Sequence, residues 1–208
     1  MEIKYGNLIL RTLTENDLEK VRTARNHNWV NNFLMDRQHI SKEMQVKWFK
    51  QIQWESQHYW IMSSKQNDIG IIYLSNWQID TQSANSNLFL FEEHWSGHPD
   101  LIRAVWLITF LCFYGISCEK LTSTVNNGNT NALEIDKYIG FSLLDTHSDF
   151  LQSVCTRDSF YRNSQAILKL FFKKEHSLNI HNCNNAGLFA PLRNWENRNI
   201  DIYSILGL

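Results

Sequence analysis

The longest apolar stretch of the chain lies between two shorter runs that are typical of β-strands, and this succession limits the folds open to it. The stretch predicts a helix over residues 99–114, with Pro99 in the first turn, where a missing N–H is tolerated. The flanking residues 85–91 and 120–125 predict strands. Strand, helix and strand in this order indicate a mixed α/β fold.

Further strands and helices are expected on both sides of this unit. Strands are predicted over residues 8–13, 58–62, 69–74, 150–156 and 165–172. Helices are predicted over residues 15–25, from residue 41 onward, and over 129–138, where Gly140 provides a left-handed stop. The Asn-rich remainder is expected to be an irregular extension whose last residues dock as a strand or short helix. We therefore expect one domain, residues 1–172, with an extension over residues 173–208 packed on it.

The charge balance argues against a nucleic-acid or membrane partner. Lys and Arg number 20 and Asp and Glu 21, so the net charge is −1 and no global field favours a polyanion. The most apolar part, residues 104–116, is shorter than the roughly 20 residues that span a bilayer. The N-terminus lacks the features of a signal peptide, which predicts a cytoplasmic protein. The four cysteines form no CxxC pair, so reduced structural thiols are expected rather than disulfides or a metal site.

Residues 129–141 read NTNALEIDKYIGF and carry a motif of Asn, two residues, Ala and an apolar residue, closing in Gly-Phe. This motif resembles one in the GNAT superfamily of acyl-CoA N-acyltransferases, and the order of expected elements over residues 8–172 is similar to that of the family. The resemblance implies one mixed sheet of about seven strands, splayed at its centre, with helices on both faces. It also implies that acetyl-CoA serves as co-substrate and that the acceptor is an amine.

A second resemblance concerns the region between the first and second expected strands. It rests on Leu10-Arg11, Arg25-Asn26-His27, Val30, Met35, Ile40-Ser41 and Trp48-Phe49. This set is similar to the N-acetyltransferases of nucleotide-linked amino sugars, especially that of the pseudaminic-acid pathway. The acceptor implied is a small molecule, with candidate substrate contacts at Arg25, Asn26, Trp29, Met35, Gln45, Trp48 and Trp77. For Trp48 and Phe49, packing in the core is the competing interpretation.

The family resemblance also places the coenzyme. Pantetheine would pair with the edge of the strand at residues 87–91, and the pyrophosphate would rest on backbone N–H groups that open the next helix. The candidate coenzyme contacts are Leu90, Phe91, Ser96, Gly97, His98, Leu101, Ile102, Arg103 and Asn129.

The loop that would hold the pyrophosphate departs from the family pattern. Pro99 and Leu101 stand where the family has small residues, and Asp100 is expected to bring a negative charge near the phosphates. At an effective dielectric constant of about 20, a repulsion over about 4–5 Å costs roughly 3–4 kcal/mol before screening. His98 and Arg103 are expected to offset part of this cost.

Acetyl transfer needs a proton acceptor for the amine and allows a proton donor for the thiolate. Glu92, Glu93 and His94 are candidates for a base or a relay, with a solvated turn as the alternative. The family's acid is a Tyr seven residues after the motif Asn, but this position is Asp136, expected to be exposed, ionised and a poor acid. Tyr138 is the candidate substitute.

Three functions remain open at this point. The first is acetyl-CoA-dependent N-acetylation of a nucleotide-linked amino sugar. The second is a GNAT-like scaffold that binds without catalysing, which the altered loop motivates. The third is acetylation of a protein N-terminus or side chain.

A homodimer formed through the C-terminal extension is a further expectation. No metal is expected, because His94 and His98 lack a third ligand.

Overall fold

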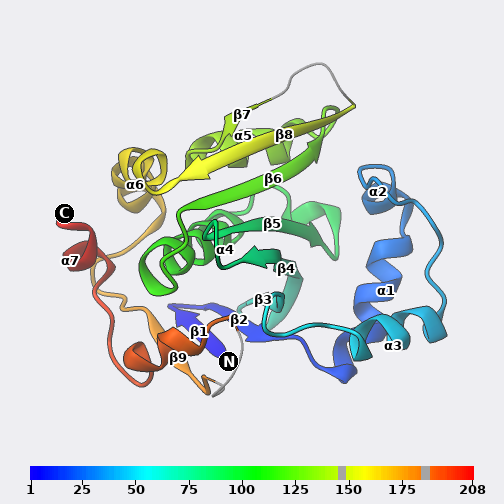
Figure 1. Ribbon diagram of the computed structural model, residues 1–208, viewed down its shortest axis with the longest axis horizontal. Helices are drawn as coiled ribbons and strands as arrows, with labels where there is room; N and C mark the ends of the chain where they lie inside the picture. Colours follow the sequence, from blue (N-terminus) through cyan, green and yellow to red (C-terminus); the bar gives the residue numbers. More distant parts are fainter. Residues whose placement is uncertain (145–148, 184–187) are drawn as a thin grey trace.

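The computed structural model describes residues 1–144, 149–183 and 188–208 and places nine strands in one sheet, in the order β7-β8-β6-β5-β4-β3-β2-β1-β9 (Figure 1). The strands are β1 (Glu2–Tyr5), β2 (Leu8–Thr12), β3 (His58–Ser64), β4 (Asn67–Gln78), β5 (Ser83–Leu90), β6 (Lys120–Asn126), β7 (Ser142–Leu143), β8 (Phe150–Thr156) and β9 (Asn179–His181). The helices are η1 (Glu15–Asp17), α1 (Leu18–Asn26), α2 (Asn28–Asn31), α3 (Lys42–Lys50), η2 (Glu93–Trp95), α4 (Pro99–Phe110), η3 (Leu111–Gly115), α5 (Thr130–Ile139), α6 (Arg157–Phe171), η4 (Ala190–Trp195) and α7 (Ile202–Leu206).

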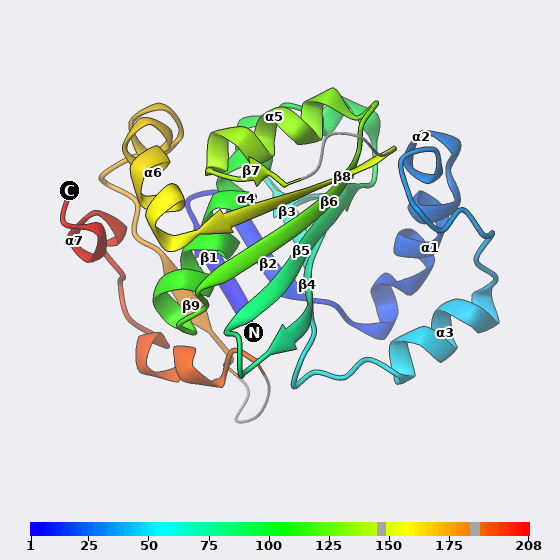
Figure 2. The ribbon, with the colours of Figure 1, turned by 45° about the horizontal axis from the view of Figure 1, so that its top comes forward.

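The helices cover both faces of the sheet, as expected. Successive residues of β3 alternate between two apolar clusters: Tyr59 and Ile61 join Val21 of α1 on one face, and Trp60 and Met62 join the cluster around α4 on the other. Figure 2 shows α1, α2 and α3 together at one side of the molecule, away from α6 and α7. This alternation follows from the two-residue period of a strand that is buried on both faces.

The sheet opens between β5 and β6, at its centre. These strands are parallel, and their pairing stops after three residue pairs, the last of which joins Asn85 to Thr122. The Thr122 hydroxyl lies 2.7 Å from Oδ1 of Asn85 and marks the end of the contact. Beyond this point residues 86–90 and 123–126 have no pairing with each other. The centrally splayed sheet that the family resemblance implies is therefore present.

One predicted strand is wrong. Residues 165–172 lie mostly in α6, which begins one residue after β8. Thr156 caps this helix: its hydroxyl accepts a hydrogen bond from the Ser159 N–H at 3.3 Å, and the Ser159 hydroxyl accepts one from the Thr156 N–H at 3.0 Å. Phe160, Ile167 and Leu168 then share the buried helical face.

The expected count of about seven strands is corrected to nine. β1, β7 and β9 are short strands that the sequence analysis does not predict, and each has only two to four residues. β9 pairs with β1 in antiparallel register, so the C-terminal part of the chain completes the sheet beside the N-terminal strand (Figure 1). The last helix, α7, buries Ile202 and Leu206.

Candidate active site

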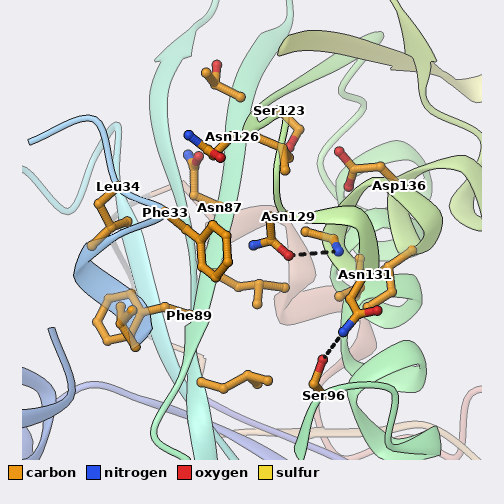
Figure 3. A pocket seen from close by; sticks show the side chains of 18 of the residues that line it. Phe33, Leu34, Asn87, Phe89, Ser96, Ser123, Asn126, Asn129, Asn131 and Asp136 are labelled. Carbon is orange, nitrogen blue, oxygen red and sulfur yellow. Dashed lines mark hydrogen bonds between the residues drawn. The ribbon is translucent and has the colours of Figure 1, made fainter. Parts of the chain in front are cut away.

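A cavity of about 380 Å³ fills the opening between β5 and β6. β5 contributes Ser86 to Leu90, β6 contributes Ser123 to Asn126, and the first two turns of α5 form the adjoining wall. Figure 3 shows Phe33 and Leu34 on one side of this space and Asn131 and Asp136 on the other. Unpaired strand edges next to a cavity can bind an extended chain that carries amide groups.

The wall formed by α5 is built by a capped helix start. The Asn129 side chain accepts a hydrogen bond from the Ala132 N–H at 3.2 Å and so closes the first turn. The Asn131 side chain donates to the Ser96 hydroxyl at 2.9 Å, which joins the helix to the loop before α4. Of the predicted coenzyme contacts, Asn129, Ser96, Leu90 and Leu101 line the cavity.

Asp136 also lines the cavity, and this corrects the expectation that it is exposed. It is half-buried, and the Ser153 hydroxyl donates to its Oδ2 at 3.2 Å. Burial raises the pKa of Asp136 to about 6, while hydrogen bonds from Ser123 and Ser153 act to lower it. An aspartate with this pKa exchanges protons near neutral pH, which the sequence analysis does not foresee.

At the start of α4 most backbone amides are already bonded. The Ser96 N–H donates to Glu93, the His98 N–H to Trp95 and the Leu101 N–H to His98. The N–H of Asp100 donates to Nδ1 of His98, so His98 caps the helix with its side chain. Gly97 has a φ of +74°, which suits glycine, and its N–H makes no hydrogen bond to the described residues.

The carboxylate of Asp100 is turned into the protein rather than toward a ligand. Asp100 is buried, forms an ion pair with Arg103 and accepts a hydrogen bond from Ser64 of β3. Arg103 also donates to the carbonyl of Phe171 at the end of α6. Neither side chain lines the cavity. The expected repulsion of phosphate by Asp100 is therefore largely cancelled, and Arg103 is engaged within the protein instead of facing the coenzyme site.

The remaining coenzyme candidates lie outside the cavity. Ile102 is buried in the apolar side of α4, and Phe91 packs half-buried against the cluster on the α1 face. Among the catalytic candidates, Glu93 lines the cavity. Glu92 and His94 are exposed and lie 3.3 Å apart, measured from Oε2 to Nδ1. Tyr138 is 60% exposed and does not line the cavity, because a shift of two residues along the helix turns it away.

Of the predicted substrate residues, Trp29 lines the cavity. Arg25 lies near it, since its charge opposes the rise in pKa that burial causes in Tyr73, which is a lining residue. Nη1 of Arg25 is buried and has no hydrogen-bond partner among the described residues. Asn26 instead holds the backbone of Ile40 with two hydrogen bonds of 2.8 Å.

The other four substrate candidates do not line the cavity. Gln45 is buried on α3, and Trp48 packs edge-on against Tyr59 with ring centroids 5.0 Å apart. Trp77 packs half-buried against the core cluster on the α4 face, and Met35 is 70% exposed. Packing therefore accounts for Trp48, the alternative that the sequence left open.

Several lining residues are missed by the sequence analysis: Phe33, Leu34, Tyr73, Ser123 and Asn126. Tyr73 occupies a middle position of β4, where its ring stacks on Tyr59 at 5.0 Å. Phe33 and Leu34 follow α2, a one-turn helix without a periodic pattern. Two sequence features could have indicated these lining residues: the aromatic residues close to Trp29, and the polar residues at the end of the strand predicted over 120–125.

Each helix in the part of the chain that the structure describes is too short or too polar to span a bilayer. Within the same residues, no three His, Cys, Asp or Glu side chains are grouped so that they could hold a metal ion. The four cysteines are free, and Cys112, Cys118 and Cys155 are buried.

Residues 7–142 match the sequence profile of the acetyltransferase (GNAT) domain. No curated protein matches the chain in sequence. Among solved structures, the spermidine N-acetyltransferase from Vibrio cholerae in complex with CoA and spermine has a TM-score of 0.68 at 15% identity, over 74% of this chain and 98% of that one. FdhC, a nucleotide-linked sugar GNAT in its apo form, has a TM-score of 0.68 at 16% identity, over 82% of this chain and 98% of that one. A domain from Methanocaldococcus jannaschii DSM 2661 has a TM-score of 0.64 at 18% identity, over 74% of this chain and 99% of that one.

Proposed function

The chain belongs to the family of acetyltransferase (GNAT) domains, and from this premise we propose that it transfers an acetyl group from acetyl-CoA to the amine of a nucleotide-linked amino sugar. One observation supports this proposal above all: the cavity between β5 and β6, along which both strands have unpaired edges. The pantetheine arm of acetyl-CoA is an extended chain with two amide groups, and it can pair with such an edge as an added strand would.

The residues at the α4 end of this edge fit the coenzyme. Toward α4, the Gly97 N–H makes no hydrogen bond to the described residues, and the space beside its Cα is open, since no atom lies within 4 Å of the place that a Cβ would occupy. Nδ1 of His98 accepts a hydrogen bond, so Nε2 carries the ring proton and can donate to an anion. Asp100 does not oppose this, since Arg103 neutralises its charge.

The acceptor is proposed to lie at the α2 side of the cavity. Phe33 and Asn87 lie there (Figure 3), and Trp29 and Tyr73 are further aromatic residues that line the cavity. Flat rings beside a few polar groups suit a sugar or base. FdhC, the structural neighbour that acts on a nucleotide-linked sugar, also supports the sugar as acceptor.

The test is thiol release from acetyl-CoA with a panel of acceptors: UDP- and dTDP-linked amino sugars, spermidine, and a peptide with a free N-terminus. We expect release with at least one amino sugar and none with the other two. Release with spermidine or the peptide alone would replace the proposed acceptor, and release with no acceptor would contradict the proposed reaction.

Phe33→Ala sharpens this experiment. Since stacking of a base on an aromatic ring contributes about 1–3 kcal/mol, we expect the KM for the acceptor to rise about tenfold, while the KM for acetyl-CoA stays unchanged. Met35→Ala is the matched control, because Met35 lies two residues away and is exposed outside the cavity. Equal KM values for the two variants would count against an acceptor site at α2.

A second candidate, a GNAT scaffold that binds partners without catalysing, is favoured by the few free amides at the start of α4. Calorimetry separates it from the enzyme, because micromolar binding of acetyl-CoA would argue against it.

A further inference from the structure

Asp136 projects into the cavity from α5, two helical turns after Asn129, which lines the same cavity. Two serine hydroxyls hold its carboxyl group. Ser153 of β8 donates to Oδ2 at 3.2 Å, and Ser123 of β6 provides a second hydrogen bond. The carboxyl is thus fixed by neutral donors from the sheet, while the side chain still borders the open space where the two strands separate.

The charges around Asp136 leave it without a permanent counterion. No ion pair within residues 1–144, 149–183 and 188–208 involves Asp136. Among the described residues, the Cys155 thiol on β8 lies close enough for the Asp136 charge to help raise its pKa, and Glu93 lines the same cavity. On α5 itself, Glu134 and Lys137 are exposed, and neither shifts the pKa of Asp136. Burial is therefore the cause that keeps its pKa near neutrality, at about 6.

We propose that Asp136 is the proton carrier of the acetyl transfer, taking the proton from the attacking nitrogen and delivering it to the departing sulfur. This inference rests on the proposed function. It assigns both proton transfers to one carboxyl group at the point where β5 and β6 separate.

The step balances with one proton. The neutral amine forms a bond from its nitrogen to the carbonyl carbon of the thioester. The carbon–sulfur bond breaks, and its electron pair stays on sulfur. The nitrogen loses one proton to the Asp136 carboxylate, which then passes it to the thiolate, so that the amide and the free thiol of CoA result. A thiol has a pKa of about 8.5, so transfer from a carboxylic acid with a pKa of about 6 to a thiolate is downhill.

The test measures kcat against pH, with acetyl-CoA and the acceptor that wild type uses best. Because the ionised carboxylate must accept the proton, wild-type kcat should fall on the acid side with an apparent pKa near 6. Asp136→Asn should lower kcat by about a hundredfold or more, leave the KM for acetyl-CoA unchanged and lose the acid limb. Asp136→Glu should keep the limb with partial activity. Glu134→Gln is the matched control on the same helix, since Glu134 is exposed, and should behave as wild type.

Ser153→Ala gives a readout that does not depend on the folding of the Asn variant. The Ser153 hydrogen bond lowers the pKa of Asp136, so its removal should move the acid limb to higher pH. Two outcomes would overturn this inference alone, provided that wild type transfers acetyl. In the first, Asp136→Asn keeps the acid limb of kcat; in the second, Ser153→Ala leaves this limb at the same pH as in wild type. Wild type that transfers acetyl to no amine would overturn the proposed function, and this inference with it.

Discussion

Asp100 shows how one side chain decides whether a helix start can accept phosphate. Its carboxylate points into the protein, where Arg103 and Ser64 bind it, while the His98 side chain caps the first turn of α4. The same ion pair connects α4 to the end of α6 through the bond from Arg103 to the Phe171 carbonyl. Asp100 therefore acts on stability and not on the coenzyme.

Asp100→Asn tests this assignment. The Asn side chain has the same shape as the Asp side chain but leaves Arg103 without a charged partner, so the free energy of unfolding should fall by about 2 kcal/mol. Its affinity for acetyl-CoA should equal that of wild type, because the charge it removes is already neutralised. Denaturant unfolding and calorimetry measure the two quantities. A clear gain in affinity would show that Asp100 repels the phosphates after all.

His58 gives the fold a dependence on pH. It is buried at the start of β3, and burial lowers its pKa from 6.5 to about 3. Between these values the unfolded chain binds a proton that the folded protein excludes, so stability is full above about pH 6.5 and falls as the pH drops toward 3. At pH 5 the loss should be about 2 kcal/mol. Urea unfolding at pH 7 and pH 5 should show this loss in the free energy of unfolding, and His58→Gln should reduce it. An equal loss in wild type and His58→Gln would contradict the role of His58.

At the scale of elements, α5 depends on how it ends. Gly140 stops the helix with a φ of +113°, and a Cβ there would lie 2.7 Å from the carbonyl oxygen of Ser159 on α6. The absence of a side chain thus allows α5 and α6 to approach closely. Since α5 carries Asn129 and Asp136, this ending also fixes the wall of the cavity.

Gly140→Ala should therefore destabilise the protein by about 2–3 kcal/mol, because backbone strain and a steric clash add. Gly207→Ala is the matched control: its φ is also positive, at +69°, but nothing lies within 4 Å, so only strain remains and the cost should be about 1 kcal/mol. Thermal unfolding compares the two. Equal losses would mean that the contact with α6 contributes nothing.

The elements that the sequence predicts correctly are those whose ends carry local signals. Pro99 and the capping residues Ser41 and Asn129 mark three helix starts, and Gly140 marks an end. The strands predicted over residues 58–62 and 69–74 leave too long a turn between β3 and β4, because Lys65 and Gln66 both adopt positive φ values without being Gly or Asn. The apolar content of residues 165–172 also suits a strand, whereas the helical spacing of the buried residues that begins at Phe160 places most of them in α6.

The candidate site was predictable where the family motif names a position, as at Asn129, and less so where burial decides. The expectation for Asp136 failed because a raised pKa depends on the surroundings that β6 and β8 supply, and these lie up to 17 residues away along the chain. Phe33 joins the site through the path of the irregular segment after α2. No periodic pattern in the sequence records that path.

For the whole molecule, the C-terminal part is built into the core. Leu178, Ile180, Leu192 and Ile202 belong to the same buried cluster as α4, and a Cβ on Gly115 would lie 2.3 Å from Leu192. These residues are therefore already used within one chain. A homodimer through residues 173–208 stays a prediction, and light scattering of the purified protein tests it.

The proposed reaction requires that the opened sheet binds the coenzyme, and calorimetric titration with acetyl-CoA tests this most directly. Ala132→Trp fills the cavity from α5, whereas Leu133→Trp places the same ring one position further, at a residue that does not line it. We predict one acetyl-CoA bound per chain with a micromolar Kd, lost in Ala132→Trp and kept in Leu133→Trp. Absence of binding by wild type at millimolar acetyl-CoA, or equal binding by both variants, would contradict the account.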